Sequence, residues 1–178
     1  MAGLAVAPIP MTVDELNGLA QGDAVEAFLR CCGSSAWAAE MADRRPYADL
    51  AEMLARADEV WSGLGPEDWL EAFAHHPRIG GDDSAQQRFQ TTRAWSAGEQ
   101  SGAAGASDEL RSRLAAGNDE YFERFGFVFL ICATGRSAAE MLASLQSRIG
   151  NDRDTELRIA AEEQRRILRL RIEKLVTP

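Results

Sequence analysis

Apolar residues recur three and four positions apart along most of the chain, which is the spacing that places side chains on one face of a helix. In the stretch that begins at Tyr47, the apolar positions include Leu50, Met53, Ala57 and Trp61, and the stretch ends at the sequence GLGP. Further helices are predicted at residues 12–16, 24–30, 36–44, 66–74, 108–125, 137–149 and 154–176, with additional helical stretches at 84–95 and 96–101.

Residues suited to helix starts support this assignment. Thr12 and Glu15 have the spacing of a capping box, in which two side chains satisfy backbone N–H groups at the beginning of a helix. Pro66 is suited to the first position of a helix, where its missing N–H costs nothing. Caps of three further helices are expected at Asp23, Ser35 and Asp108.

One apolar run, FGFVFLIC at residues 125–132, is too short for its period to distinguish a helix from an extended segment. We expect it to be buried in the core. The chain has no repeat, no linker and no strand-rich half. The predicted fold is therefore all-α, a single compact domain of about eight or nine helices that covers residues 1–178.

The composition is that of an ordinary globular protein, with 46% hydrophobic and 26% charged residues. A formal net charge of -9 argues against a nucleic-acid partner, because phosphate binding needs a basic patch. No apolar run approaches the roughly 20 residues of a membrane span. The start, MAGLAVAPIPM, lacks the basic residues of a secretory signal, and the ending, LVTP, is not a peroxisomal signal. These features favour a cytoplasmic protein.

The three cysteines do not form a metal-binding or disulfide pattern. Cys31 and Cys32 are adjacent and Cys132 is distant, and the sequence contains neither CxxC nor HExxH. We expect all three to be free and buried, and we expect no metal site. A serine nucleophile is not indicated either, because the motif GxSxG is absent.

The chain has only two histidines, His75 and His76, and both lie in the segment AFAHHPRIGG. A helix is expected to end here, where Pro77 fixes one backbone dihedral and the glycines permit close approach of a ligand. The ordinary pKa of histidine, near 6.5, suits His76 to general acid–base catalysis. Alternatively, a histidine at a helix C-terminus interacts only with the helix dipole.

A second candidate segment reads WSAGEQSG. Ser96 and Glu99 have the spacing of a capping box, which on its own would explain both residues. Alternatively, Glu99 and Gln100 form an acid–amide pair, in which the carboxylate could exchange a proton with a heterocycle while the amide fixes its orientation. The spacing alone favours the capping box.

The C-terminal helix contains a third candidate, Arg171, which borders the predicted inner face. Its guanidinium could bind a substrate carboxylate with two hydrogen bonds, although a structural salt bridge is the more common role. The inner face is predicted from the apolar residues Ile159, Ile167, Leu170 and Leu175, and most other arginines are expected on exposed flanks near Glu162, Glu163 and Glu173.

Together these segments resemble the family of 2-oxo-4-hydroxy-4-carboxy-5-ureidoimidazoline decarboxylase, the OHCU decarboxylase of urate breakdown. The order HPRIG, then SxxEQ, then FGFxF carries the resemblance. It extends through nearly the whole chain, including CCGSSAWAAEMADRRPY, AFAHHPRIG, SAGEQSG, NDEYFERFGFVFLICATG and LQSRIGNDRDTELRIAAEEQRRILRLRIEKL.

The resemblance implies a role for each residue of the HP and SxxEQ motifs. His76 is implied as the catalytic histidine, and Pro77 shapes its turn. Ser96, Glu99 and Gln100 are implied to line the substrate pocket, with Glu99 taking part in proton transfer.

Beyond these motifs, the resemblance implies that Arg171 binds the substrate carboxylate. Arg148 is a second candidate for this role, because it lies in a similar sequence context. The segment after FGF is expected to contribute main-chain contacts near Ile131, whereas His75 has no assigned counterpart.

The family also implies a homodimer that needs neither a metal nor an organic cofactor. Its reaction is the decarboxylation of 2-oxo-4-hydroxy-4-carboxy-5-ureidoimidazoline to (S)-allantoin and CO2 in urate degradation. Two other functions remain open on the residues alone. One is a helical module that binds a small anion or a partner helix without turnover, which should expose an apolar patch. The other is a lyase or hydrolase that acts on a different ureide.

Overall fold

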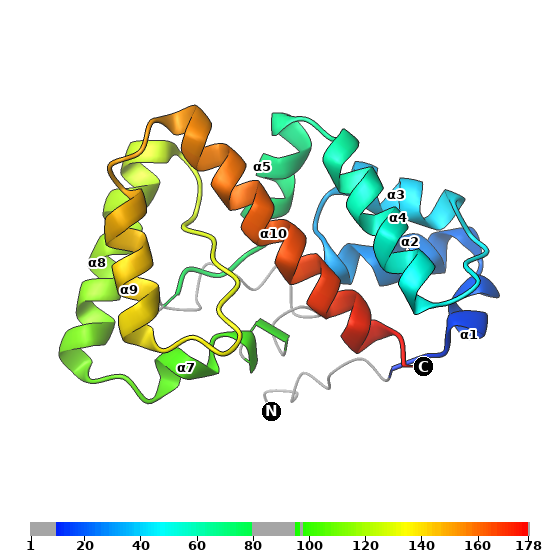
Figure 1. Ribbon diagram of the computed structural model, residues 1–178, viewed down its shortest axis with the longest axis horizontal. Coiled ribbons are helices and arrows are strands. Elements are labelled where there is room, and N and C mark those ends of the chain that lie inside the picture. Colours follow the sequence, from blue (N-terminus) through cyan, green and yellow to red (C-terminus); the bar gives the residue numbers. More distant parts are fainter. Residues whose placement is uncertain (1–9, 80–94, 97, 178) are drawn as a thin grey trace, which may run out of the picture.

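The computed structural model describes residues 10–79, 95–96 and 98–177, and helices dominate this part of the chain (Figure 1). No β-strand occurs among these residues, which confirms the all-α prediction. An isolated bridge joins Met11 to Val176, so the two ends of the described chain lie together. The helices are α1 (Val13–Asn17), α2 (Gln21–Cys31), α3 (Ser35–Asp43), α4 (Leu50–Gly63), α5 (Pro66–Ala74), α7 (Ser101–Ala104), α8 (Asp108–Phe125), α9 (Ala138–Arg148) and α10 (Arg153–Leu175).

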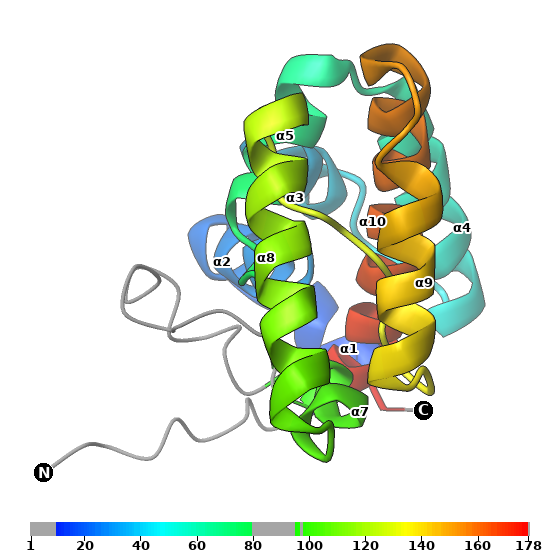
Figure 2. The ribbon, with the colours of Figure 1, turned by 90° about the vertical axis from the view of Figure 1, so that its left-hand side faces the viewer.

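The long helix α10 is the central element of the fold. It crosses the molecule diagonally in Figure 1 and packs against α2, α4 and α5. On its other side, α8 and α9 pack against each other and form one end of the molecule, as Figure 2 shows. Leu168 and Ile172 are fully buried on the inner face of α10. This face therefore joins the N-terminal helices to the rest of the core.

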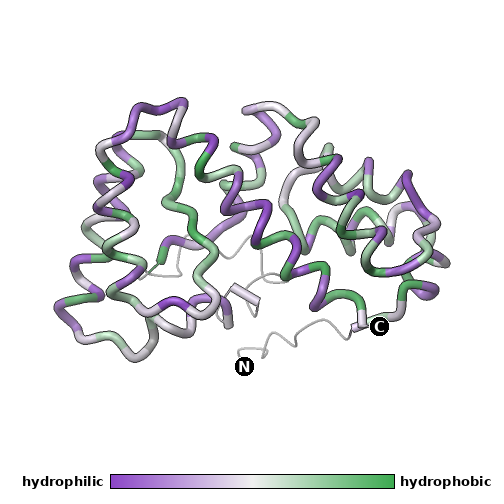
Figure 3. The backbone as a smooth tube through the Cα atoms, in the orientation of Figure 1, coloured by the Kyte–Doolittle hydropathy of each residue, from purple (hydrophilic) through white to green (hydrophobic). Residues whose placement is uncertain are grey.

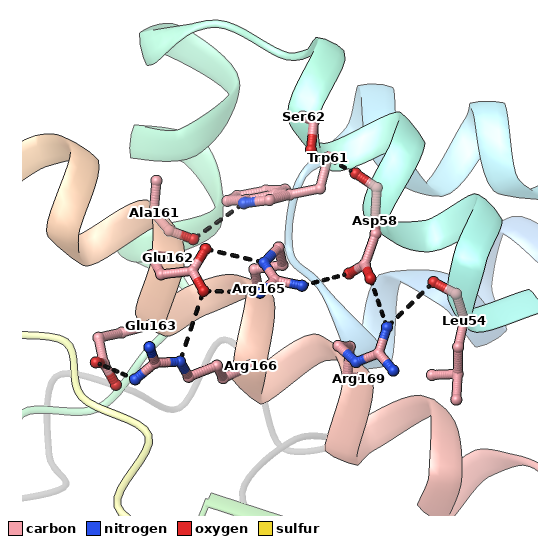
Figure 4. Close-up of polar contacts among 10 residues, drawn as sticks. All are labelled: Leu54, Asp58, Trp61, Ser62, Ala161, Glu162, Glu163, Arg165, Arg166 and Arg169. Carbon is pink, nitrogen blue, oxygen red and sulfur yellow. Dashed lines mark hydrogen bonds and ion pairs between the residues drawn. The ribbon is translucent and has the colours of Figure 1, made fainter.

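Polar contacts fix α4 against α10 on the outside of this core (Figure 4). The indole N–H of Trp61 donates a hydrogen bond to the Ala161 carbonyl at 3.0 Å. Asp58 of α4 accepts hydrogen bonds from Arg165 and Arg169 of α10, at 3.0 and 2.5 Å. Such partly exposed pairs each contribute only about 0 to 1 kcal/mol, so apolar burial provides most of the attachment.

The segment between α8 and α9 is extended, not helical. Gly126 ends α8 with a φ of 79°, a left-handed conformation that favours glycine. The chain then runs through the core, where Phe127, Phe129 and Ile131 are buried. Figure 3 shows apolar residues along this segment, which is the yellow-green loop that leads from α8 to α9 in Figure 1. The prediction that the run is buried is confirmed, and its conformation is now defined.

Several predicted helix boundaries need correction. The first helical residue of α2 is Gln21 and its N-cap is Ala20, so the expected cap Asp23 lies in the first turn. The caps of α3 and α8 are Ser34 and Ser107, each one residue before the predicted one. For α3 and α8 two residues suited to an N-cap are adjacent, and the sequence does not determine which of them stays outside the helix. For α2 the N-cap Ala20 makes no side-chain capping bond, so no capping residue marks the start of this helix.

Other expectations are confirmed only in part. The helix expected from Tyr47 begins at Leu50, because Asp49 caps it and Tyr47 packs as a buried residue. The sequence GAAGAS, expected as a loop, contains the end of the short helix α7. Within the inner face of α10, Ile167 and Leu175 are buried, while Ile159 and Leu170 are only partly buried. Residues 84–94 of the helix predicted at 84–95 lie outside the described residues.

No helix in the described part of the chain is both long and apolar enough to cross a membrane.

Candidate active site

A pocket lies where the end of α5, the helical residues 95–96 and 98–99 with Gln100, the extended segment and α10 meet. It encloses about 350 Å3 of space between protein atoms, part of which is open to solvent. Six residues proposed from the sequence line it, namely His76, Pro77, Ser96, Glu99, Gln100 and Ile131. Its other described lining residues are Ile79, Phe129, Leu130, Ala133, Thr134 and Ile167. The fold therefore brings together motifs that are far apart in the sequence.

His76 follows directly on the end of α5. Its backbone N–H donates a hydrogen bond to the Phe73 carbonyl at 3.1 Å, so the last turn of the helix fixes its position. The side chain is 8% exposed, and its Nε2 lies 2.6 Å from Oε1 of Gln164 on α10. Burial lowers the pKa of His76 to about 3, with a further lowering by the nearby Arg171 guanidinium. The imidazole is therefore neutral at physiological pH. The sequence suggested that His76 would have the ordinary histidine pKa near 6.5, and the buried site lowers it.

Glu99 and Ser96 are both held by Arg171, which is 3% exposed. Arg171 donates from Nε and Nη2 to the two carboxylate oxygens of Glu99, each at 3.0 Å, and from Nη2 to Oγ of Ser96 at 3.1 Å. Lys174 adds a second cation, with its Nζ 3.2 Å from Oε1 of Glu99. The side chains of Ser96 and Glu99 are therefore both bound to α10. These contacts account for the two residues without a capping box.

The other candidate arginine, Arg148, has different partners. Its Nε and Nη2 donate to Oε1 of Glu156 at 2.8 and 2.6 Å, and the hydroxyl of Tyr121 also binds this oxygen. Nη1 donates to the Leu130 carbonyl at 2.8 Å. Arg148 therefore supports the extended segment behind the pocket. Neither Arg148 nor Arg171 is among the described lining residues, but only Arg171 binds side chains that line the pocket.

Two contacts of the site were not predicted from the sequence. Gln164 binds His76, and Glu163 accepts a hydrogen bond from the Cys132 backbone N–H at 2.7 Å. The helical spacing of Gln164, Ile167 and Arg171 could have placed these three on one face of α10. It could not have shown which distant residues that face contacts.

The two remaining sequence features have structural settings. His75 is the half-buried C-cap residue of α5, and a Cβ atom added to Gly33 would lie 2.3 Å from its ring. Cys31 and Cys32 are free and buried, as predicted, whereas Cys132 is only partly buried. Burial raises the pKa of Cys32 to about 12, which keeps this thiol protonated at neutral pH. Among the described residues, no group of three or more His, Cys, Asp or Glu side chains could hold a metal ion.

Comparison with known proteins decides the family. The family model of OHCU decarboxylase matches residues 17–173. This chain belongs to the OHCU decarboxylase family. It is 30% identical over 177 residues to 2-oxo-4-hydroxy-4-carboxy-5-ureidoimidazoline decarboxylase of Amia calva. The match covers 93% of this chain and 95% of that protein.

A solved structure supports the same assignment. The crystal structure of an OHCU decarboxylase in the presence of (S)-allantoin is 40% identical to this chain and superposes with a TM-score of 0.71. The match covers 83% of this chain and 95% of that one. The family resemblance inferred from HPRIG, SxxEQ and FGFxF is therefore confirmed.

Some relatives are longer proteins. The chain is 42% identical over 147 residues to the uric acid degradation bifunctional protein TTL of Arabidopsis thaliana, covering 82% of this chain but 45% of that protein. The bifunctional protein PucL of Bacillus subtilis is matched over 33% of its length. The chain thus spans less than half of these bifunctional relatives.

Proposed function

We propose that this protein decarboxylates 2-oxo-4-hydroxy-4-carboxy-5-ureidoimidazoline to (S)-allantoin and CO2 in urate degradation. The proposal rests on one observation above all. Six of the seven residues that the family resemblance assigns to catalysis and substrate binding line a single pocket, from His76 at its helix end to Ile131 on the extended segment. The seventh, Arg171, is not among the described lining residues and binds two of them, Glu99 and Ser96. The names of the relatives and the (S)-allantoin in the related crystal structure point to the same reaction.

The substrate supplies its own electron acceptor. It carries a hydroxyl and a carboxylate on one ring carbon, next to a carbon that bears the ureido group and is doubly bonded to nitrogen. When the bond to the carboxylate breaks, its electron pair enters this C=N unit and the ring nitrogen takes up a proton. The resulting enol loses its hydroxyl proton, the ureido-bearing carbon gains one, and one proton is taken up overall. The protein therefore needs to manage protons and charge, and we propose that it uses no cofactor.

Within this scheme His76 accepts the proton of the ring hydroxyl. A neutral imidazole has one unprotonated nitrogen, and burial, which lowers the pKa of His76, keeps the ring in this neutral form. Glu99 relays a proton at the ureido-bearing carbon, and protonation on one face gives a single enantiomer. Gln100, Pro77 and the main chain near Ile131 orient the ring.

Arg171 provides positive charge next to the pocket-lining residues Glu99 and Ser96. It is held by Glu99 and Ser96, and we propose that it attracts the substrate carboxylate while it orients Glu99. A charge-assisted hydrogen bond of this kind contributes about 1.5 to 3 kcal/mol.

The test is a coupled assay that generates the unstable substrate from urate with urate oxidase and hydroxyisourate hydrolase. Circular dichroism follows the appearance of optically active allantoin, with and without EDTA. Rapid formation of one enantiomer that EDTA does not slow, well above the spontaneous racemic background, supports a cofactor-free decarboxylase. If a folded sample gives no acceleration, the anion-binding module becomes the better explanation, and CO2 release from other ureides would identify a different lyase.

The proposal extends to the assembly and location of the protein. We propose a cytoplasmic homodimer in which residues 1–178 form one OHCU decarboxylase-like domain, as the family resemblance implies. Light scattering after size-exclusion chromatography should give twice the chain mass. A monomer with full turnover would remove the dimer from the proposal.

A further inference from the structure

One buried side chain next to the pocket has no role in the mechanism above. Gln164 of α10 is 0% exposed and does not belong to the described pocket lining. Its Oε1 lies 2.6 Å from Nε2 of His76, whereas its own Nε2 has no hydrogen-bond partner among the described residues. Burying an amide with a single partner is costly, so its one hydrogen bond requires an explanation.

The geometry of this hydrogen bond determines where the imidazole carries its proton. The amide oxygen of Gln164 only accepts, so Nε2 of His76 must be the protonated nitrogen. In a neutral ring the lone pair is then on Nδ1. The contact also fixes the ring plane, because Gln164 lies on the rigid helix α10 and His76 on the end of α5.

We propose that Gln164 is a positioning residue that holds His76 as the neutral Nε2–H tautomer, so that Nδ1 is the nitrogen that accepts the substrate hydroxyl proton. The part of this proposal in which Nδ1 accepts the substrate proton rests on the proposed function. The tautomer of His76 and its dependence on Gln164 do not rest on that function, because both can be measured without substrate.

The choice of an amide over a carboxylate matters for the charge of the ring. Arg171 and His75 both disfavour a positive charge on His76, and Glu99 is occupied by Arg171 and Lys174. A carboxylate at position 164 would accept the same hydrogen bond and would also stabilise the imidazolium ion. Protonation of Nδ1 would remove the lone pair, so the amide orients the base without charging it.

The chain contains only two histidines, which makes a direct spectroscopic test practical. Isotope-labelled histidine gives two sets of ring-nitrogen NMR signals, and a His75→Gln variant assigns them. Near pH 7 we expect His76 to be neutral with its proton on Nε2. In Gln164→Glu we expect His76 to become an imidazolium ion near pH 7. A proton on Nδ1 in the unaltered protein, or an unchanged His76 in folded Gln164→Glu, would overturn the proposal.

A matched control separates this effect from a general change in charge. Gln146 lies on α9 and is exposed, and Gln146→Glu introduces the same chemical change there. We expect the His76 signals to stay as they are in the unaltered protein. The same protonation of His76 in both variants would also overturn the proposal.

Kinetics test the consequence for turnover. Gln164→Met has a similar length and only a weak acceptor. We expect its kcat to fall about ten- to a hundredfold with KM within about twofold, which is the loss typical when the orienting partner of a metal-bound histidine is removed. Gln164→Glu should lose activity near pH 7 and regain part of it as the pH rises past the new pKa of His76. A folded Gln164→Met with unchanged kcat would refute the positioning role. If the unaltered protein itself forms no allantoin, the proposed function fails, and the NMR measurements still decide the tautomer.

Discussion

Arg171 and Arg148 are both buried and both paired with a glutamate, but the two pairs differ in what they support. The Glu99 that binds Arg171 lines the pocket, whereas the Glu156 that binds Arg148 is 0% exposed and lies behind it. Removing one partner of a buried ion pair strongly destabilises the fold, because the other charge stays buried. Glu99 keeps Lys174 as a second cation when Arg171 is removed, whereas Glu156 forms an ion pair only with Arg148 among the described residues. The two arginines should therefore respond differently to the same substitution.

His76→Asn tests the proposed base. The variant keeps a polar side chain of smaller size in the pocket, so it should bind ligand, but its amide cannot accept the hydroxyl proton. We expect kcat to fall about a hundredfold to ten-thousandfold, the usual contribution of general acid–base catalysis. The coupled circular dichroism assay measures the rate, and near-normal turnover would remove His76 from the mechanism.

Arg171→Ala tests whether Arg171 binds the substrate carboxylate. We expect KM to rise about ten- to a hundredfold, because a charge-assisted hydrogen bond of about 1.5 to 3 kcal/mol is lost. Arg169→Ala on the outer face of α10 is the matched control, since Arg169 pairs with Asp58 away from the pocket. Equal effects of the two variants on KM would contradict the assignment.

Arg148→Ala should act on stability. We expect the free energy of unfolding to fall by about 3 to 5 kcal/mol, because Glu156 would be left buried and without its cation. Urea unfolding measures the loss, and the double variant Arg148→Met, Glu156→Gln should recover part of it. Normal stability together with a raised KM would instead move the carboxylate-binding role to Arg148.

At the residue scale, local motifs predicted which side chains belong to the site but not how they are charged or held. His76 and Glu99 were identified through the family resemblance that HPRIG and SxxEQ carry, not through their spacing alone. The pairing of Glu99 with Arg171 spans 72 positions, and the low pKa of His76 depends on burial and on the Arg171 guanidinium of α10. Interactions of this kind arise from the tertiary fold, so a single sequence does not reveal them.

At the scale of elements, the helices followed from periodicity and the connections did not. The apolar spacing of α4 and α10 predicted both helices, because one face of each is buried over several turns. The run FGFVFLIC has no such face. It is buried on several sides, with the ring of Phe127 packed against those of Phe73, Tyr121 and Phe125. Only the fold shows that it is extended.

The short helix α7 depends on close approach of its backbone to the loop before α9. A Cβ atom added to Gly102 would lie 1.9 Å from the Arg136 carbonyl oxygen, while one added to Gly105 would meet nothing within 4 Å. Because a backbone oxygen cannot swing aside as a side chain can, Gly102→Ala must displace α7 or the loop. Gln100 is the N-cap residue of α7, so this displacement reaches the pocket.

We therefore expect Gly102→Ala to lower the free energy of unfolding by about 1 to 3 kcal/mol, as overpacking commonly does, and to reduce turnover as well. Gly105→Ala should stay within about 0.5 kcal/mol of the unaltered protein. Thermal unfolding and the coupled assay on both variants provide the measurements. Similar behaviour of the two variants would show that α7 does not pack tightly on the loop.

At the scale of the whole molecule, the class of fold was predictable and the position of α10 was not. A helix with apolar residues on one face must pack against something, and an all-helical chain of this length can bury such a face in a single core. The sequence does not state that α10 contacts α2, α4 and α5 together. That arrangement places Gln164 and Arg171 beside His76 and Glu99, and it also gives the molecule a pH-dependent stability.

His76 makes the clearest contribution to the change of the unfolding free energy with pH. In the unfolded chain its pKa is near 6.5, whereas burial and Arg171 lower it to about 3 in the folded protein. Between these values the unfolded chain binds a proton that the folded protein does not, so the stability falls as the pH decreases from about 6.5 toward 3. Above about pH 7 both states are neutral, and His76 contributes no slope.

The difference between the unaltered protein and His76→Asn isolates this contribution, because all other titrating groups are shared. Relative to the variant, the unaltered protein should lose about 2 kcal/mol of unfolding free energy between pH 7.5 and 5, which is the linkage cost of protonating one histidine only in the unfolded chain. Urea unfolding at several pH values gives the difference directly. A difference that does not change with pH would mean that His76 titrates alike in both states, so that burial and Arg171 do not hold the imidazole in its neutral form.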